Sequence, residues 1–326
     1  MLALTMGEPA GIGAEIAVKA WHALRATGPA FLLIDDASRI TGAPVARVAD
    51  ADAARAAFAA ALPVLHRPLP VAAIPGQPSL ATAAAVIAAI EEAVRLAKSG
   101  AVDGLITNPI QKSVLTAAGF AHPGHTEFLG ELAGTGVPPV MMLACDHPPP
   151  GLRVVPVTVH EPLRKAIARL SPELIVEHAR VTHAALIRDF GIASPRLAVA
   201  GLNPHAGEAG TLGHEDQAIV APAVAALRAL GIDATGPWPP DTLFSAQSRP
   251  RYDAAICLYH DQALIPIKTL DMAGGVNVTL GLSIIRTSPD HGTALDIAGK
   301  GVASAESLIA ASRLAAQLAE HRRTHA

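Results

Sequence analysis

Aromatic residues, charged residues and cysteines are all scarce in this 326-residue chain. Aromatic residues make up 3% and charged residues 16%, with a net charge of -3. Neither stacking platforms for bases nor a basic surface is therefore expected, which argues against a nucleic-acid partner. The two cysteines, Cys145 and Cys257, form no Cys-x-x-Cys pair, so thiolate metal sites and redox motifs have no support. Two cysteines are too few for a disulfide framework, which is consistent with a reducing cytoplasm.

The chain also lacks a long uninterrupted apolar run. Its most apolar helix-like segment, residues 80–90, is followed at once by Glu91 and Glu92, and it is too short to span a bilayer. The N-terminal residues show neither the basic region nor the long apolar region of a signal peptide. We therefore expect a cytoplasmic protein with no membrane partner.

Apolar residues are abundant, at 51% of the chain, and short apolar runs alternate with amphipathic helical patterns. This alternation predicts an α/β fold with largely parallel sheets covered on both faces. The helical patterns at residues 80–98 and 172–190 begin after plausible N-caps, Ser79 and Ser171. The length allows one large domain or two moderate ones. The predicted strands are residues 2–5, 31–34, 104–107, 154–159, 197–200 and 254–259.

Polar residues follow the ends of four of these strands. Asn108 follows one, and His160, His205 and His260 follow three others. Ligands of α/β sheets bind outside the carboxyl ends of the strands, and three imidazoles can hold a divalent transition metal. Each histidine taken alone could simply cap a turn, but the shared position of the three favours a metal site.

Two glycine-rich segments could bind an anion. Residues 5–15 lie between a strand and a helix, so a helix N-terminus and close backbone approach are available there. Ile16 occupies the third glycine position of the dinucleotide fingerprint, and no Gly-Lys-Ser/Thr sequence follows. The segment is therefore neither a Rossmann fingerprint nor a P-loop, and a tight strand-to-helix turn is the alternative.

The second segment, residues 274–281, follows Lys268 and contains Asn277. Arg286 comes after the strand-like run 278–285 and opens a sequence rich in small hydroxyl residues. Lysine, asparagine and arginine together suit a phosphate or carboxylate. The alternative is a solvated loop with a surface arginine.

Nine segments between residues 5 and 301 make the chain resemble a known family, that of the 4-hydroxythreonine-4-phosphate dehydrogenases of pyridoxal 5'-phosphate biosynthesis. The segments are TMGEPAGIGAEI, TNPIQK, HPGHTEF, VTVHEPLR, GLNPHAGE, PPDTLF, YHDQALIPIK, GVNVTLG and RTSPDHGTALDIAGKG. Several are long and unusual in composition, so the resemblance is specific. It covers nearly the whole chain.

The resemblance implies a two-domain α/β/α architecture similar to the isocitrate and isopropylmalate dehydrogenases, without a Rossmann GxGxxG. We expect residues 1–118 with 290–326 to form the first domain. Residues 119–289 would form the second, carrying most metal and substrate ligands. The resemblance further implies a homodimer with its active site near the subunit interface.

The resemblance also assigns roles to particular residues. Metal-binding positions of the family fall on His160, His205 and His260, the three histidines at strand ends. Substrate-binding positions fall on His125, Thr126, Lys268, Asn277 and Arg286. We expect the dinucleotide at Asp241, Thr242, Asn277 and Asp290.

The implied reaction oxidises 4-phosphooxy-L-threonine with NAD or NADP and one divalent ion (Zn, Mg or Co). The product, 2-amino-3-oxo-4-(phosphooxy)butanoate, would lose CO2 to give 3-amino-2-oxopropyl phosphate. Lys268 and Asp261 are alternative general bases. Ala14 and Met272-Ala273 differ from the residues that are common at these positions in the family. A phosphorylated sugar acid (phosphoerythronate or phosphothreonate) or a cis-dihydrodiol is therefore an alternative substrate. Two other classes of protein are alternatives. An acyl- or phosphotransferase would need no metal triad, so the three histidines argue against it. A binding protein without turnover would not need Lys268 or Asp261 as a base, so these residues argue against that class.

Overall fold

The structure is a computed structural model that describes residues 1–122, 124–134 and 136–325. Pro123 of the HPGHTEF segment lies outside the described residues. The chain divides into unit 1, residues 1–139 with 282–320, and unit 2, residues 140–281 with 321–326. This division differs from the expected one, because residues 119–139 and 282–289 pack within unit 1.

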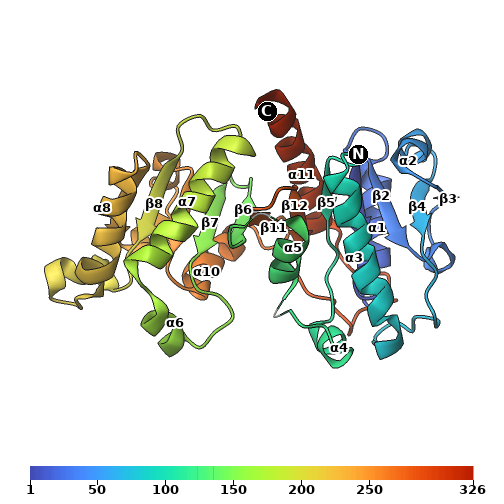
Figure 1. The fold of residues 1–326 in the computed structure, drawn as a ribbon, viewed down its shortest axis with the longest axis horizontal. Coiled ribbons are helices and arrows are strands. Elements are labelled where there is room, and N and C mark those ends of the chain that lie inside the picture. Colours follow the sequence, from blue (N-terminus) through green and yellow to red (C-terminus); the bar gives the residue numbers. More distant parts are fainter. Residues whose placement is uncertain (123, 135, 326) are drawn as a thin grey trace. The chain divides into compact units, whose positions relative to one another are not determined.

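The sheet of unit 1 is parallel in each of its described pairings, as the βαβ alternation of the sequence predicts. Its strands other than β1 are labelled in Figure 1. In spatial order they are β3 (Val45–Arg47), β4 (Leu62–His66), β2 (Phe31–Asp35), β1 (Leu2–Thr5), β5 (Gly104–Ile106) and β12 (Arg286–Pro289).

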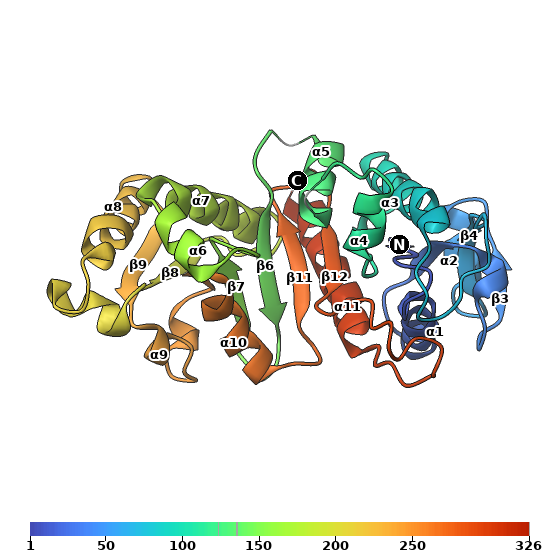
Figure 2. The same ribbon diagram turned by 90° about the horizontal axis from the view of Figure 1, so that it is seen from below.

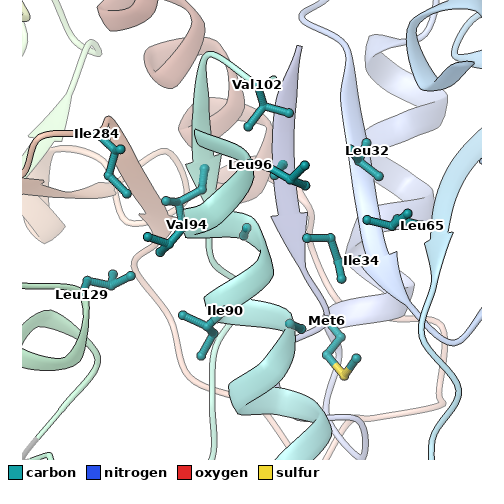
Figure 3. Packing of buried hydrophobic residues seen from close by; sticks show 14 of the residues in the cluster. Met6, Leu32, Ile34, Leu65, Ile90, Val94, Leu96, Val102, Leu129 and Ile284 are labelled. Atoms are coloured by element: carbon teal, nitrogen blue, oxygen red, sulfur yellow. The ribbon is translucent and has the colours of Figure 1, made fainter. Parts of the chain in front are cut away.

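Helices cover both faces of this sheet, and Figure 2 shows α3 (Ala83–Lys98) and α1 (Gly13–Leu24) on opposite sides of it. Alternate strand residues face α3, so Leu32 and Ile34 pack in one core cluster with Ile90 (Figure 3). Further helices of the unit are α2 (Ala51–Ala57), α4 (Lys112–Ala117), α5 (His125–Ala133) and α11 (Glu306–His325), whose residues from His321 on belong to unit 2, with η1 (Ala37–Arg39) and η2 (Leu80–Thr82).

The sheet of unit 2 is mixed. Its strand β6 pairs antiparallel with both β11 and β7, whereas the other pairings are parallel. In spatial order the strands are β11 (Val276–Leu280), β6 (Val140–Cys145), β7 (Leu152–Pro156), β10 (Ala254–Cys257), β8 (Arg196–Ala200) and β9 (Asp233–Trp238).

The helices of unit 2 also lie on both faces, with α7 (Pro172–Arg188) and α10 (His260–Leu270) on opposite sides of the strands (Figure 2). Ala263 and Ile267 of α10 pack in a core cluster with strand residues. The other elements are α6 (Leu163–Arg169), α8 (Ala221–Ala229), α9 (Pro240–Leu243), η3 (Pro204–Gly210), η4 (Asp216–Val220) and η5 (Arg249–Arg251).

The α/β class is confirmed, and so is Ser171 as the N-cap of α7. Ser79 caps the short 3-10 helix η2, and α3 itself begins only at Ala83. Ser79 accepts a hydrogen bond from the amide of Ala81, and Ser171 accepts one from Leu174. Residues 278–285 do not form the single strand that the sequence predicts. Strand β11 ends at Leu280, and Arg286 is the first residue of the next strand, β12. Among the described residues, no helix is both long and apolar enough to cross a membrane.

Candidate active site

Two of the three predicted metal-binding histidines lie close together in unit 2. The ring centroids of His160 and His260 are 5.8 Å apart, with 48° between the ring planes. The strands that precede them, β7 and β10, are parallel neighbours, and Val157 donates a 2.8 Å backbone hydrogen bond to Cys257 beyond their ends. The pairing of these strands therefore brings the two imidazoles together.

Asp261 contacts the second of these histidines. Its Oδ1 lies 2.6 Å from Nδ1 of His260, so an Nδ1–H tautomer would donate to the carboxylate. That tautomer leaves Nε2 as the nitrogen available to a ligand, an arrangement common around metal-binding imidazoles. Asp261 is thus placed to fix the orientation and tautomer of His260.

A cavity of about 360 Å³ adjoins this pair. Residues that follow β7 and β10 line it, and one of them, Thr158, donates a 2.9 Å hydrogen bond from its hydroxyl to the Leu258 carbonyl. Glu161 also lines the cavity and is paired with Arg169 at 3.1 Å. The lining residues are Thr158, His160, Glu161, Pro162, Leu163, Ala166, Tyr259, His260 and Asp261.

The third predicted histidine, His205, lies in a left-handed turn after β8. Residues 205–209 all have positive φ, from 41° to 79°, and only Gly207 among them is glycine. A left-handed conformation costs roughly 1–2 kcal/mol for each non-glycine residue. His160 also has a positive φ, of 51°. Such strain persists only where surrounding contacts impose it, and it is concentrated at functional sites.

Asp216 supplies contacts that hold this turn in place. Its carboxylate is buried and accepts hydrogen bonds from the amides of Leu202 and Asn203, at 2.7 and 3.0 Å. The Asn203 side chain donates to the same carboxylate at 3.0 Å. Asp216 itself begins the π-helical turn η4, an irregularity often found at functional sites.

Gln262 ties the turn to the histidine pair. Its side chain donates to the carbonyl of Gly201 at 2.7 Å and accepts from the amide of Leu258 at 2.6 Å. One buried amide thereby joins the chain preceding His205 to the chain preceding His260. Even so, no group of three or more His, Cys, Asp or Glu side chains in the described part of the chain is arranged to hold a metal ion.

The donor chemistry of this cavity fits two ligands of a transition metal. Two neutral imidazoles are borderline ligands suited to zinc or cobalt, and Asp261 orients one of them. His205 is not among the residues that line the cavity. The described chain therefore brings together two members of the predicted triad and not the third.

A second polar cluster lies in unit 1, around the buried guanidinium of Arg286. Its Nε and Nη2 donate to the hydroxyl of Thr107 at 3.0 and 2.6 Å. Burial lowers the pKa of Arg286 to about 10, so the side chain stays a cation at neutral pH. Burial, with a smaller effect of the Arg286 charge, holds the pKa of His125 well below its usual range. The buried Nε2 of His125 has no hydrogen-bond partner in the described structure, a costly condition that a ligand would relieve.

The other predicted residues are distributed over both units. Thr126 follows His125 on α5 of unit 1, where Asp290 lies just after β12. Lys268 is half-buried in the last turn of α10, and Asn277 lies on β11. Asp241 and Thr242 are exposed on α9. The predicted substrate-binding residues thus belong to unit 1 (His125, Thr126, Arg286) and to unit 2 (Lys268, Asn277).

The first glycine-rich segment is explained by close packing of the chain on itself. A Cβ added to Gly7 would lie 2.6 Å from the carbonyl oxygen of Pro109, and one added to Gly13 would lie 2.6 Å from that of Met6. Asn108 donates to the carbonyls of Thr5 and Gly13 and so fastens the turn. These contacts favour the alternative interpretation, a tight strand-to-helix turn.

Sequence reasoning missed Thr107, Asp216 and Gln262 as residues of interest. Thr107 and Gln262 lie inside the quoted segments TNPIQK and YHDQALIPIK, directly beside residues that were selected. Asp216 gave no such signal, because it lies eleven residues after His205 outside every quoted segment. Only the fold brings its carboxylate to Leu202 and Asn203.

Comparisons with known proteins agree over nearly all of the chain. The model of the family described as pyridoxal phosphate biosynthetic protein PdxA matches residues 24–315. A 4-hydroxythreonine-4-phosphate dehydrogenase of Caulobacter vibrioides is 54% identical over 98% of both chains. The crystal structure of the enzyme with the same description from Klebsiella pneumoniae superposes with a TM-score of 0.86 at 40% identity, covering 98% of this chain and 99% of the other. A terephthalate 1,2-cis-dihydrodiol dehydrogenase of Burkholderia xenovorans is 31% identical, with a TM-score of 0.64 and 97% coverage of each chain.

Proposed function

The chain belongs to the family of the pyridoxal phosphate biosynthetic protein PdxA, and we propose that it oxidises 4-phosphooxy-L-threonine with NAD or NADP. The family predicted from the motifs is confirmed. Full-length identity of 54% to a 4-hydroxythreonine-4-phosphate dehydrogenase carries the proposal. The reaction transfers hydride from C3 to the nicotinamide and releases the hydroxyl proton, leaving 2-amino-3-oxo-4-(phosphooxy)butanoate. Loss of CO2 from this β-keto acid gives 3-amino-2-oxopropyl phosphate.

Arg286 and His125 recognise a charged end of the substrate in this proposal. The buried cation of Arg286 can donate two parallel hydrogen bonds to a phosphate or carboxylate. Because the pKa of His125 is lowered, this imidazole is neutral at pH 7 and can donate or accept one hydrogen bond. Thr126, Lys268 and Asn277 stay predicted substrate ligands.

One divalent ion completes the proposed site, held by His160, His260 and His205. Bound there, it would lower the pKa of the substrate hydroxyl and polarise the ketone product as a Lewis acid. The proximity of two imidazoles supports this, and so do the strained backbones at His160 and His205. The predicted homodimer has its active site near the subunit interface, so a second copy could supply the ligand that the described residues of one chain do not bring together.

Lys268 is the better of the two predicted general bases. The Asp261 carboxylate already contacts Nδ1 of His260 at 2.6 Å, which gives it an orienting role. A base in hydroxyl oxidation must be able to reach the substrate proton, and Lys268 is half-buried on the same helix, α10. We therefore assign proton removal to Lys268 and positioning of His260 to Asp261.

The nucleotide is proposed to bind at Asp241, Thr242, Asn277 and Asp290. Two of these residues, on α9, are exposed and belong to the PPDTLF segment that carried the resemblance. Hydride transfer itself is the chemistry of the nicotinamide. A cytoplasmic location also stays a prediction.

Absorbance at 340 nm tests the proposal directly. Purified protein should reduce NAD+ or NADP+ in the presence of 4-phosphooxy-L-threonine and a divalent ion, and the rate should disappear after chelation. Phosphoerythronate, phosphothreonate and a terephthalate cis-dihydrodiol should be assayed in parallel, because the relative at 31% identity acts on such a diol. Faster turnover of the diol would replace the proposed substrate, and no reduction with any substrate would favour a transferase or a binding protein.

A further inference from the structure

The hydroxyl of Thr107 accepts two hydrogen bonds from the Arg286 guanidinium, at 3.0 Å from Nε and 2.6 Å from Nη2. We propose that Thr107 is a positioning residue that fixes the guanidinium plane of Arg286 for a phosphate or carboxylate ligand. This inference rests on the proposed function, in which Arg286 binds an anionic end of the substrate. Thr107 itself would not touch the ligand.

The main chain around Thr107 is rigid on both sides. Its amide donates to the carbonyl of Thr287 at 3.0 Å, beyond the pairing of β5 with β12. The next amide, of Asn108, donates to the hydroxyl of Thr5 at 3.3 Å, on the other neighbouring strand. Because β5 is held by β1 and β12 together, the hydroxyl of Thr107 is a fixed point in the sheet.

The contact constrains one edge of the guanidinium. Nε and Nη2 share that edge and both donate to one oxygen, so rotation about the last side-chain bonds would break both hydrogen bonds. The two terminal nitrogens form a second edge, which can also donate two parallel hydrogen bonds to a phosphate or carboxylate. Holding the first edge therefore sets the direction of the second, and pre-positioning of this kind increases affinity by lowering the entropy lost on binding.

A hydroxyl suits this role better than a carboxylate would. It accepts hydrogen bonds without neutralising the cation, so Arg286 keeps its charge for the ligand. Nearby His125 is neutral at pH 7, because burial and the Arg286 charge lower its pKa. Its buried Nε2 has no partner in the described structure, so one ligand could satisfy that atom and pair with the arginine.

Substitutions at Thr107 separate the hydroxyl from the shape of the side chain. Thr107→Val keeps the branching and removes the acceptor, whereas Thr107→Ser keeps the acceptor. The control is Thr287→Val, because Thr287 is equally buried in the adjacent strand. Its hydroxyl donates to the Ala311 carbonyl on α11 at 3.0 Å, and alternation along the strand turns it away from the face that carries Arg286.

Inorganic phosphate is the binding probe, measured by calorimetric titration of the full-length protein, with substrate kinetics alongside. A hydrogen bond to a charged group is worth enough that Thr107→Val should weaken phosphate binding and raise KM by about 10- to 100-fold. Its kcat should change by less than about threefold, because substrate at saturation overcomes a binding defect. Thr107→Ser and Thr287→Val should bind phosphate within about threefold of the parent.

Arg286→Ala distinguishes a failure of the Thr107 positioning role from a failure of the proposed substrate contact of Arg286. If Arg286→Ala abolishes phosphate binding and Thr107→Val does not weaken it, Thr107 is not a positioning residue and the proposed function stands. If Arg286→Ala binds phosphate like the parent, the assignment of Arg286 to the substrate is wrong. Should Thr107→Val fail to fold, Thr107→Cys replaces it, because sulfur is a weak acceptor of similar size. Parent-like phosphate affinity in that variant would overturn the inference.

Discussion

Unit 1 and unit 2 hold their candidate ligand residues in opposite ways. In unit 1, Arg286 is buried within a parallel sheet and fastened by Thr107. In unit 2, His160 and His205 are exposed, and both have left-handed backbones in loops. The first site carries the desolvation cost of a buried charge, and the second carries backbone strain. The difference teaches that binding geometry can be maintained by sheet hydrogen bonds or by strained loops with buried supports.

The largest expected effect is at the histidine pair. His160→Ala or His260→Ala should abolish turnover and reduce bound divalent metal, because each removes one nitrogen ligand. Activity at 340 nm and metal content by mass spectrometry measure this. His183→Ala, on α7, is the matched control and should keep both. Full activity of the parent protein after chelator treatment would contradict the metal proposal.

Arg286→Ala comes next, and it tests the buried site of unit 1. Removing one partner of a charged contact costs about 2–5 kcal/mol, so substrate KM should rise by one to several orders of magnitude. Nucleotide affinity should change much less. Arg249→Ala removes a similarly buried arginine of unit 2, which donates to the Pro148 carbonyl, and should leave KM unchanged. An unchanged KM with lost NAD+ binding in Arg286→Ala would assign this pocket to the nucleotide.

Asp216→Ala tests the support of the strained loop. Loss of a hydrogen bond to a charged group costs about 1.5–3 kcal/mol, so the free energy of unfolding should fall by at least this amount, and metal affinity should fall with it. Asp253→Ala is the control, since Asp253 accepts from the Arg196 amide at the start of β8. Chemical denaturation and metal titration separate the two variants: both should lose stability, and only Asp216→Ala should lose metal affinity. Equal metal affinities would show that the turn needs no such support.

The smallest expected effect is a pH dependence from His125. Its pKa is lowered in the folded state, so the unfolded chain takes up a proton first as the pH falls through about 6.5. The contribution of His125 to the free energy of unfolding is therefore fully present above about pH 6.5. Below that pH it decreases, by at most about 1.4 kcal/mol per pH unit. His125→Asn should remove this contribution, measured as the difference between the unfolding free energies of the two proteins from pH 7.5 to 5. Parallel pH profiles would refute it.

Much of the fold could be predicted because local patterns and tertiary contacts agree. Ser79 and Ser171 start helices where their side chains indicate, and the predicted strand at residues 2–5 matches β1. The histidines that follow β7 and β10 lie together because neighbouring parallel strands end at one edge. The N-caps and the strand depend on spacing along a short stretch of sequence, whereas the histidine pair depends on the rule that parallel strands end at one edge of a sheet.

The supports of the candidate site could not be predicted in this way. Ala206 and Ala209 have positive φ, against their own local preference, because distant contacts impose the turn. Thr107 lies 179 residues from Arg286, and the sequence gives no spacing rule for such a pair. The domain boundary was misjudged near residue 119 for a related reason, since α5 packs with α3 in unit 1 and no linker composition marks the change.

The π-helical turn at residues 216–220 distinguishes a change of chain length next to Asp216 from a substitution of this residue. A π-turn contains one residue more than an α-turn and holds that residue within the turn. Deleting one residue after Asp216 would therefore let the helix close as a regular α-helix, without the rotation of about 100° that a deletion in a regular α-helix causes. The carboxylate would keep its direction towards the amides of Leu202 and Asn203. Support of the His205 loop thus tolerates the loss of one residue here, whereas it depends on the identity of Asp216.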